Sequence, residues 1–242
     1  ITTEKLGIIK NSENVIIAKQ KKNVDDFIHK KLKKKKNVFY YNENYKFKIF
    51  SKKKISFKFL DIKTTINKPS LKGIHQIENA SSAIASVIIL KKNNYNIKLN
   101  SLSKSVYETK WPGRIEKIKY KNKYIILDGS HNLSGAEKLN EYLIDNNLRP
   151  NVILGMLNNK KILEFLSILK KNINILYPIT IPKEINALNS IDIYNIAKKI
   201  DIKSQIKKNF RDINQSIMKQ PNKYILITGS LYLIGRVRKT YL

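Results

Sequence analysis

The sequence predicts an α/β fold whose second half contains a mainly parallel sheet. Apolar residues run through 124–127 and stop at Asp128, after which apolar residues recur at helical spacing. A second apolar run at 224–227 ends in the same way at Thr228. Buried strands that pass directly into helices are the building units of such a sheet. Both runs are therefore expected to be strands of one α/β domain.

Strand and helix patterns alternate through this half of the chain. Proline stops a helix and glycine frees the backbone, so Trp111-Pro112-Gly113-Arg114 predicts a boundary between residues 1–110 and residues 111–242. We expect strands at 115–120, 124–127, 152–157, 173–177 and 224–228, and helices at 133–145, 160–170, 190–199, 209–218 and 231–238.

The first half of the chain predicts helices combined with antiparallel strands. Alternating apolar and polar residues over 38–62 are typical of antiparallel strands. The remaining predicted elements are a helix that breaks at Gly7, a strand at 15–17, and helices at 25–35, at 80–90 and from Ser101 or Ser103 to Thr109. The chain begins inside an element without an initiator methionine, so we expect it to be part of a longer protein.

Composition limits the class of protein. The 242 residues are 42% hydrophobic, enough for a substantial core, and no apolar run approaches the roughly 18 residues of a membrane span. The absence of cysteine excludes disulfides, thiolate catalysis and cysteine-ligated zinc. These features favour a cytoplasmic protein that does not bind a membrane.

The formal net charge of +30 invites a nucleic-acid hypothesis, because cationic side chains neutralise phosphates. Only five of the 48 basic residues are arginine, however, whereas base recognition relies on bidentate guanidinium contacts. Lysines are spread along the chain together with abundant asparagine and isoleucine, which is typical of an AT-rich genome. The run 31–36 is interpreted as a solvated face, and we expect no nucleic-acid partner.

Polar residues follow both predicted strand ends. Ligands bind beyond the carboxyl ends of parallel strands, where Asp128, Ser130, His131 and Asn132 would project. Together with Ser230 they could bind an anion, because helix N-termini present free amide donors. Two ordinary strand-to-helix turns would have the same composition, so that alternative stays open.

Two glycines and a histidine–asparagine pair have predicted structural roles. We expect Gly129 to permit a tight turn and Gly135 to permit close packing of helix and strand. His75 and Asn79 are four residues apart and share a helix face. Capping or hydrogen bonding is the more common role for such a pair.

Five short segments, spread along the whole chain, carry a family pattern. They are Glu4-Lys5-Leu6-Gly7-Ile8-Ile9-Lys10, His75-Gln76-Ile77-Glu78-Asn79-Ala80, Trp111-Pro112-Gly113-Arg114, Leu127-Asp128-Gly129-Ser130-His131-Asn132 and Thr228-Gly229-Ser230-Leu231-Tyr232. Together, in this order and at comparable spacing, they resemble folylpolyglutamate synthase/dihydrofolate synthase, in the Mur ligase superfamily.

The resemblance implies a particular domain organisation. Residues 1–110 would be the truncated back part of the central ATP-binding domain, and residues 111–242 the Rossmann-like C-terminal domain with a mainly parallel sheet. Family members carry an upstream P-loop, whereas this sequence contains no G-x-x-x-x-G-K-[ST] motif. The chain by itself is therefore expected to be inactive.

The resemblance also implies the chemistry. The family uses ATP and Mg²⁺ to phosphorylate a carboxylate of folate or dihydropteroate, and the amino group of L-glutamate then displaces phosphate from the acyl phosphate. Such a reaction depends on placement and on neutralising charge around the phosphates. Whether this chain serves folate polyglutamylation, dihydrofolate synthesis or both is not predicted by these segments. Relatives suggest a monomer that serves folate biosynthesis and one-carbon metabolism.

The resemblance assigns roles to five positions. Lys5 matches a lysine that is carbamylated in the family, and a carbamate offers Mg²⁺ the hard oxygen ligands it prefers. Asn79 matches the contact to adenine, Arg114 the arginine on the phosphates, and Asp128 an acid on the nucleotide. His131 matches a residue near the γ-phosphate and the incoming glutamate, where it would stabilise charge or orient substrate. Lys5, Asn79 and Arg114 are expected to meet at one nucleotide.

The alternatives to a ligase are a nucleotide-dependent oxidoreductase and a nucleic-acid-binding protein. A nucleotide-dependent oxidoreductase would need G-x-G-x-x-G after its first strand, and residues 128–135 do not supply it. A basic nucleic-acid-binding α/β module is the remaining alternative. A salt titration of binding to random duplex would separate it from the ligase.

Overall fold

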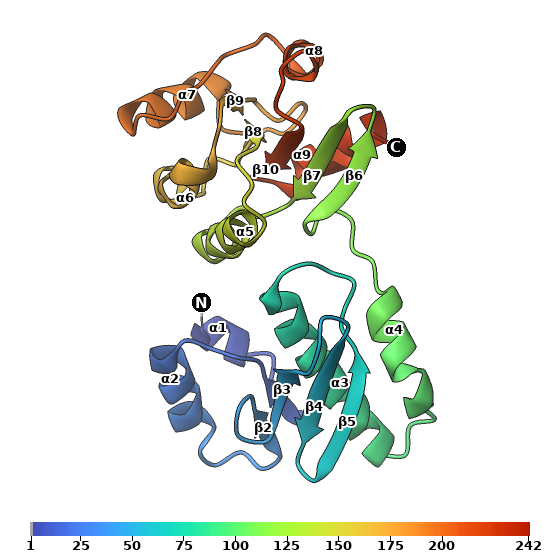
Figure 1. Cartoon of the computed structure of the whole chain (residues 1–242). Coiled ribbons are helices and arrows are strands. Elements are labelled where there is room, and N and C mark those ends of the chain that lie inside the picture. Colours follow the sequence, from blue (N-terminus) through green and yellow to red (C-terminus); the bar gives the residue numbers. More distant parts are fainter. Residues whose placement is uncertain (1) are drawn as a thin grey trace. The chain divides into compact units, whose positions relative to one another are not determined.

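The computed structural model describes residues 2–242, which form two compact units (Figure 1). The first unit comprises residues up to Ser70 together with Ile74–Lys110. The second comprises Leu71–Gly73 and Trp111–Leu242. Each unit has its own sheets and its own hydrophobic core, and each is described separately below.

The first unit combines a two-stranded parallel sheet with a three-stranded antiparallel sheet. The strands are β1 (Val15–Ile17), β2 (Val38–Tyr40), β3 (Tyr45–Ile49), β4 (Lys54–Phe59) and β5 (Ile62–Asn67). The helices are α1 (Thr2–Leu6), α2 (Lys22–Leu32), α3 (Ile74–Lys92) and α4 (Leu102–Glu108), with a short 3₁₀ turn, η1 (Leu99–Ser101).

The antiparallel prediction for residues 38–62 is correct for β3 to β5 and wrong for β2. Strand β2 pairs in parallel with β1, in the register Val15 with Val38. The reason is the connection, because α2 carries the chain back over the sheet between the two strands, and such crossovers produce parallel pairs. Alternation within a single strand cannot reveal which neighbour that strand will choose.

The core of the first unit lies between α3 and the antiparallel sheet. Ile77, Ile84 and Ile88 of α3 pack on the buried side chains of β4 and β5. A second cluster holds α1 and α2 against β1 and β2 through Ile28 and Tyr40. The apolar side of α3 is therefore the buried side, and the helix begins at Ile74.

The second unit is a five-stranded sheet with the strand order β6-β7-β10-β8-β9. The strands are β6 (Glu116–Tyr120), β7 (Lys123–Asp128), β8 (Asn151–Leu154), β9 (Leu176–Pro178) and β10 (Tyr224–Thr228). Strand β6 is antiparallel to β7, and all other pairs are parallel. The helices are α5 (Leu133–Asp145), α6 (Ile162–Leu169), α7 (Ser190–Lys199), α8 (Phe210–Met218) and α9 (Leu231–Val237), with 3₁₀ turns η2 (Lys170–Asn172) and η3 (Arg238–Thr240).

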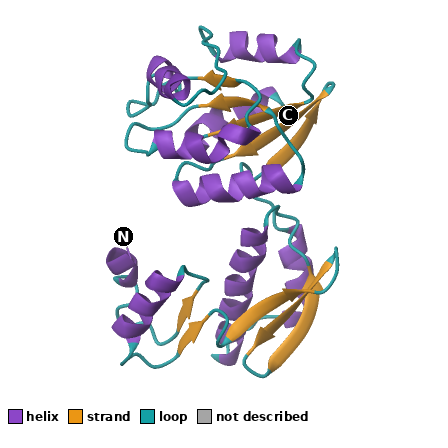
Figure 2. Ribbon diagram, turned by 60° about the vertical axis from the view of Figure 1, so that its left-hand side comes forward, coloured by secondary structure: helices purple, strands orange, loops and turns teal. Residues whose placement is uncertain are grey.

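Helices cover both faces of this sheet (Figure 2). Alternate residues of each strand point to opposite faces, so Ile126 joins one core while Ile125 and Leu127 join the other. Helices α5, α6 and α7 pack on the first face, and α8 and α9 on the second. The mainly parallel α/β domain predicted from sequence is confirmed.

The last strand of the chain lies in the centre of the sheet and creates a switch in topology. Strands β7 and β10 are neighbours, yet the helix that follows β7 packs on one face and the helix that follows β10 packs on the other. Their connections therefore diverge beyond the carboxyl ends. Open α/β sheets bind ligands at such a point. Within residues 2–242 no helix combines the length and the hydropathy that crossing a membrane requires.

Candidate functional site

Two turns lie side by side at the carboxyl edge of the second unit's sheet. Asp128 at the end of β7 is the register partner of Thr228 at the end of β10. The backbone N–H of Gly229 donates a 3.1 Å hydrogen bond to the carbonyl oxygen of Ser130 and so joins the two turns. The prediction that Asp128 and Thr228 share one sheet edge is confirmed. We call residues 128–132 and 228–230 the strand-end site.

The Asp128 carboxylate is buried and engaged by the protein's own backbone. One oxygen, Oδ1, accepts a 3.0 Å hydrogen bond from the Ser130 N–H, and the other, Oδ2, accepts one of 3.0 Å from the Ile115 N–H. The residue is only 4% exposed. Asp128 therefore fixes the turn that follows β7 and also the segment that carries Arg114.

The segment Trp111–Arg114, here called the WPGR segment, is held at both ends of Gly113. The Gly113 carbonyl accepts a 2.8 Å hydrogen bond from the Gly129 N–H. Its N–H donates one of 3.0 Å to Oε2 of Glu116. Arg114 thus follows a residue that is fixed to the strand-end site, and its backbone lies beside that site.

Glu116 is in turn fixed by Arg238. The Arg238 guanidinium donates hydrogen bonds of 2.7 to 3.1 Å to both carboxylate oxygens. These bonds lower the pKa of Glu116 below its usual value, so the carboxylate stays charged and keeps its hold on Gly113. Glu116 of β6 and Arg238 of η3 thus hold Gly113, the residue before Arg114, through hydrogen bonds.

Ile115, the residue after Arg114, has an unfavourable backbone conformation. Its φ is +49° and its side chain is 3% exposed. A β-branched residue in the left-handed region costs about 1–3 kcal/mol and persists only where its surroundings impose it. The bond from its N–H to Asp128 and the burial of its side chain supply that constraint. The direction in which the chain leaves Arg114 is therefore set by Asp128.

His131 lies in the turn itself and is half-buried. Its Nδ1 is 2.9 Å from the Gly129 carbonyl oxygen. A carbonyl only accepts, so Nδ1 carries the proton and donates. In the neutral ring the lone pair is then on Nε2, and in the charged ring Nε2 carries a second N–H. Either form leaves Nε2 as the functional atom of the ring.

The smaller polar residues of the strand-end site cap helices. The Asn132 side chain accepts from the Gly135 N–H at the start of α5, and the Ser230 side chain accepts from the Tyr232 N–H at the start of α9. This agrees with a structural role for both residues. Each cap satisfies one of the amide donors that an anion would otherwise use.

Gly129 in the turn after β7 and Gly135 in the first turn of α5 both permit close approach. Gly129 lies in the turn after β7 without a positive φ, and the positive value of +101° occurs at Gly229. A Cβ at Gly129 would clash with Leu231 of α9 instead. At Gly135 a Cβ would lie 2.9 Å from Ser130, so this glycine does permit the close packing that was expected.

His75 and Asn79 lie in the first turns of α3, on the face predicted for them. They are connected through Gln76, which lies between the two side chains. Gln76 Nε2 is 3.1 Å from His75 Nε2, and Asn79 Nδ2 donates a 3.3 Å hydrogen bond to Gln76 Oε1. Asn79 itself is exposed. Its predicted adenine contact stays a prediction.

Lys5 lies on α1 with its side chain exposed. An ammonium offers no lone pair to a cation, so Lys5 fits Mg²⁺ only as the carbamate. Lys5 and Asn79 belong to the first unit, whereas Arg114, Asp128 and His131 belong to the second. The meeting of Lys5, Asn79 and Arg114 at one nucleotide stays a prediction, as does the role of Lys5 in metal binding.

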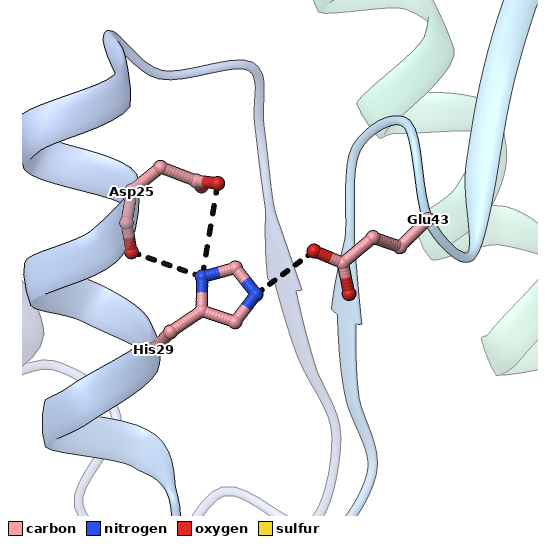
Figure 3. Close-up of side chains that lie close together, drawn as sticks. All are labelled: Asp25, His29 and Glu43. Atoms are coloured by element: carbon pink, nitrogen blue, oxygen red, sulfur yellow. Dashed lines mark hydrogen bonds and ion pairs between the residues drawn. The ribbon is translucent and has the colours of Figure 1, made fainter.

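Within residues 2–242, three carboxylate or histidine ligands come together at one place, formed by Asp25, His29 and Glu43 (Figure 3). His29 Nδ1 lies 2.9 Å from the Asp25 carbonyl and 3.7 Å from Oδ2 of the same residue, whereas Nε2 lies 2.9 Å from Glu43 Oε1. The two carboxylates therefore face different ring nitrogens. A metal binds one ring nitrogen, so this cluster is an ion-pair network between α2 and the turn before β3.

Sequence reasoning did not identify Glu116, Arg238 and Gln76. Their roles depend on partners that are distant in sequence or on the direction of a side-chain amide. Acidic residues are scarce in a chain with 18 acids against 48 bases. An acid two residues after Arg114 was thus a usable signal for Glu116, whereas no comparable signal marked Arg238 or Gln76.

The fold and the strand-end site define a class of protein, the α/β domains that bind ligands at the switch point of a parallel sheet. The family model described as "Dihydrofolate synthetase, C-terminal domain" matches residues 113–240, more than half of the chain. The chain therefore belongs to the folylpolyglutamate synthase/dihydrofolate synthase family.

Sequence comparison with curated relatives agrees with that family. The chain is 32% identical over 177 residues to a dihydrofolate synthase/folylpolyglutamate synthase of Bacillus subtilis. The aligned region covers 70% of this chain and 40% of the relative. The chain thus spans about two fifths of the length of that protein.

Solved structures with low sequence identity share the fold. A folylpolyglutamate synthase of Mycobacterium tuberculosis, complexed with ADP and AMPPCP, has a TM-score of 0.81 at 18% identity and covers 99% of this chain and 58% of its own. A bifunctional folylpolyglutamate synthase/dihydrofolate synthase with Mn, AMPPNP and L-glutamate bound has a TM-score of 0.67 at 16% identity, covering 85% of this chain and 48% of its own.

Proposed function

We propose that this chain is part of an ATP-dependent ligase that joins L-glutamate to folate, to dihydropteroate or to both. The family match over residues 113–240 supports the proposal. The structures with bound nucleotide analogue, manganese and glutamate support the ligands ATP, Mg²⁺ and L-glutamate. Residues 1–110 would be the back part of the central ATP-binding domain, and residues 111–242 the C-terminal domain.

The observation that carries the proposal is the position of Arg114 and His131 beside one strand end. Gly113 and Gly129 are hydrogen-bonded to each other, so an arginine and a histidine flank one backbone contact. A phosphoryl group passing from ATP to a carboxylate gathers negative charge on its oxygens. Cationic or N–H groups held in advance around those oxygens lower the barrier, because they need no reorganisation during the reaction.

Each residue has a role in this chemistry. Arg114 would bind the phosphates, because its planar fork donates two bonds at once. His131 Nε2 would face the γ-phosphate or the incoming amine, in a ring oriented by the Gly129 carbonyl. Asn79 would contact adenine. A bound Mg²⁺ would neutralise phosphate charge when the Lys5 carbamate helps to hold it.

Asp128 would act on the nucleotide mainly through what it holds. Both of its oxygens already accept backbone hydrogen bonds, one of them at the residue that follows Arg114. Each carboxylate oxygen has a second lone pair, so a direct contact to the nucleotide remains part of the proposal. Loss of Asp128 would in either case weaken binding of ATP.

Turnover assays on a full-length protein that contains residues 1–242 test the proposal. We expect ADP release that requires L-glutamate together with dihydropteroate or a reduced folate, and a product heavier by one glutamyl residue in mass spectrometry. Assaying the two acceptors separately decides between the two activities. ADP release that needs no glutamate would contradict the proposal.

The same preparations test the remaining expectations. The chain of 242 residues assayed alone should show no turnover, because it contains no P-loop motif. We expect a monomer in analytical ultracentrifugation and a cytoplasmic location, with no binding to membranes. Binding to random duplex at physiological salt, with a steep loss as salt rises, would favour the nucleic-acid alternative.

A further inference from the structure

The start of α3 contains a directional chain of three side chains, His75, Gln76 and Asn79, here called the amide relay. Gln76 lies in the middle and is only 7% exposed. Its Nε2 faces His75 Nε2 at 3.1 Å, and its Oε1 accepts from Asn79 Nδ2 at 3.3 Å. The amide of Gln76 is thus engaged at both of its ends.

This arrangement fixes which way the Asn79 amide points. One N–H of Asn79 is committed to Gln76 Oε1. The oxygen Oδ1 and the second N–H then remain as a neighbouring acceptor and donor. If the amide were reversed, two acceptor oxygens, Oδ1 of Asn79 and Oε1 of Gln76, would face each other.

The direction of the relay is coupled to the tautomer of His75. Gln76 Nε2 can only donate, so His75 Nε2 must present its lone pair in this arrangement. A proton on His75 Nε2 would require the Gln76 amide to reverse, and the reversed amide would require Asn79 to present its oxygen to Gln76. Each tautomer of His75 is therefore compatible with one orientation of Asn79.

The orientation of the Asn79 amide determines which purine base it can bind. The 6-position of adenine is a donor next to ring-nitrogen acceptors, which an amide with acceptor and donor in matching order can bind in bidentate fashion. Hypoxanthine has an acceptor oxygen at the 6-position, which would face and repel the Asn79 oxygen while the amide is fixed. A rotated amide can donate to that oxygen instead, so a fixed amide discriminates against hypoxanthine more strongly than a free amide does.

We propose that Gln76 is a positioning residue that fixes the Asn79 amide and thereby makes the nucleotide site selective for a 6-amino over a 6-oxo purine. The inference rests on the proposed contact between Asn79 and adenine. It adds a specificity residue, and a cause for the selectivity, to that proposed function.

The test compares ATP with ITP in the full-length protein, because these nucleotides differ at the 6-position and its neighbouring ring nitrogen. Gln76→Met keeps the size of the side chain and removes both polar ends. We expect it to lower the ratio of kcat/KM for ATP to that for ITP by about tenfold, which corresponds to about 1.4 kcal/mol. The change should appear in KM for ATP.

Gln76→Glu distinguishes positioning from packing. A carboxylate still accepts from Asn79 Nδ2, and His75 can donate to its other oxygen, so the ratio should stay within about threefold of the wild type. A packing role predicts the reverse order, because burying a carboxylate is more costly than burying a thioether. Gln76→Ala carries the same prediction as Gln76→Met if the latter does not fold.

Two further variants separate the possible failures. Gln215→Met makes the same substitution at an exposed position of α8 and should leave both nucleotides unaffected. If Asn79→Ala raises KM for ATP while Gln76→Met and Gln76→Ala leave the ratio unchanged, the inference is wrong and the proposed adenine contact stands. If Asn79→Ala leaves KM for ATP unchanged, the adenine contact is wrong and the inference falls with it.

Discussion

At the scale of single residues, the strand-end site depends on Asp128. Its two hydrogen bonds restrain both the turn after β7 and the left-handed Ile115 that follows Arg114. A buried backbone N–H that loses its acceptor costs about 1–3 kcal/mol. The carboxylate therefore contributes to folding and to the placement of Arg114 at once.

Replacing Asp128 with alanine should have two measurable effects. We expect the free energy of unfolding to fall by on the order of 3 kcal/mol, because two buried N–H groups lose their acceptor. We also expect KM for ATP to rise in the full-length protein. Chemical denaturation and steady-state kinetics measure these quantities, and Asp145→Ala, at an exposed position late in α5, is the matched control. Unchanged stability would mean that these bonds do not restrain the turn.

Replacing His131 with alanine should affect turnover more than binding. We expect kcat/KM to fall by on the order of a hundredfold, because a group that stabilises developing charge acts mainly in the transition state. The Kd for ATP should change much less. Steady-state kinetics with ATP and glutamate varied separately, combined with equilibrium binding, measure the difference. Near-normal turnover with a lowered Tm would make His131 a structural residue of the turn.

At the scale of elements, α2 is joined to the turn before β3 by His29. The ring stacks on Tyr40 at a centroid distance of 3.7 Å and pairs with Glu43 on the opposite side from Asp25 (Figure 3). Lys30 and Lys33 line the same open hollow of the surface. The hydrogen bond to the Asp25 carbonyl, assisted by Glu43, raises the pKa of His29 above its usual 6.5.

This pKa predicts a pH dependence with a definite sign. A group whose pKa is raised in the folded state contributes stability that is complete below the unfolded pKa and is lost as pH rises through the folded pKa. Stability of the first unit should therefore fall as pH increases above 6.5. The effect should be small because the ring is partly exposed.

The measurement is an NMR titration of the three histidines, combined with denaturation at several pH values. His29→Gln identifies the resonance of that ring. Glu43→Gln removes one cause of the shift, so it should lower the pKa of His29 and flatten the pH dependence. A pKa of His29 at or below 6.5 would contradict the assigned ion pair.

At the scale of the whole molecule, each unit has its own core. Two apolar clusters cover the two faces of the five-stranded sheet, and both are built from residues of the second unit. Polar side chains form hydrogen bonds with one another and with the backbone at the amino ends of β7 and β8. Buried Lys123 donates hydrogen bonds to the carbonyls of Gln220 and Asn222, and Asn151 donates to the Gln220 side chain.

Residues 111–242 should therefore fold without residues 1–110. We expect dispersed amide resonances and a single cooperative unfolding transition from this segment, because its core needs no residue of the first unit. A variant that carries Lys123→Ala should unfold at lower temperature, since two partly buried carbonyls lose their donor. A segment 111–242 without a cooperative transition would show that its core is incomplete.

The sequence by itself determined the hydrophobic period of most elements and the two turns after β7 and β10. Those features are local, because hydrophobic period, proline and glycine act within a few residues. Element order also fixed the α/β class and the edge that carries Asp128 and Thr228. The five segments are local patterns of the same kind, and they were sufficient to predict the family that the comparisons show.

Only the tertiary structure decided which strand pairs with which and where each polar group finds its partner. Strand β2 pairs in parallel with β1, and β10 lies in the centre of its sheet. The N–H of Ile115 donates to Asp128. Each of these contacts joins residues that are distant in sequence. The same holds for Arg238 and Glu116, which are 122 positions apart. Pairing of this kind is settled by packing and by the need to satisfy every buried polar group, and neither is visible in a local pattern.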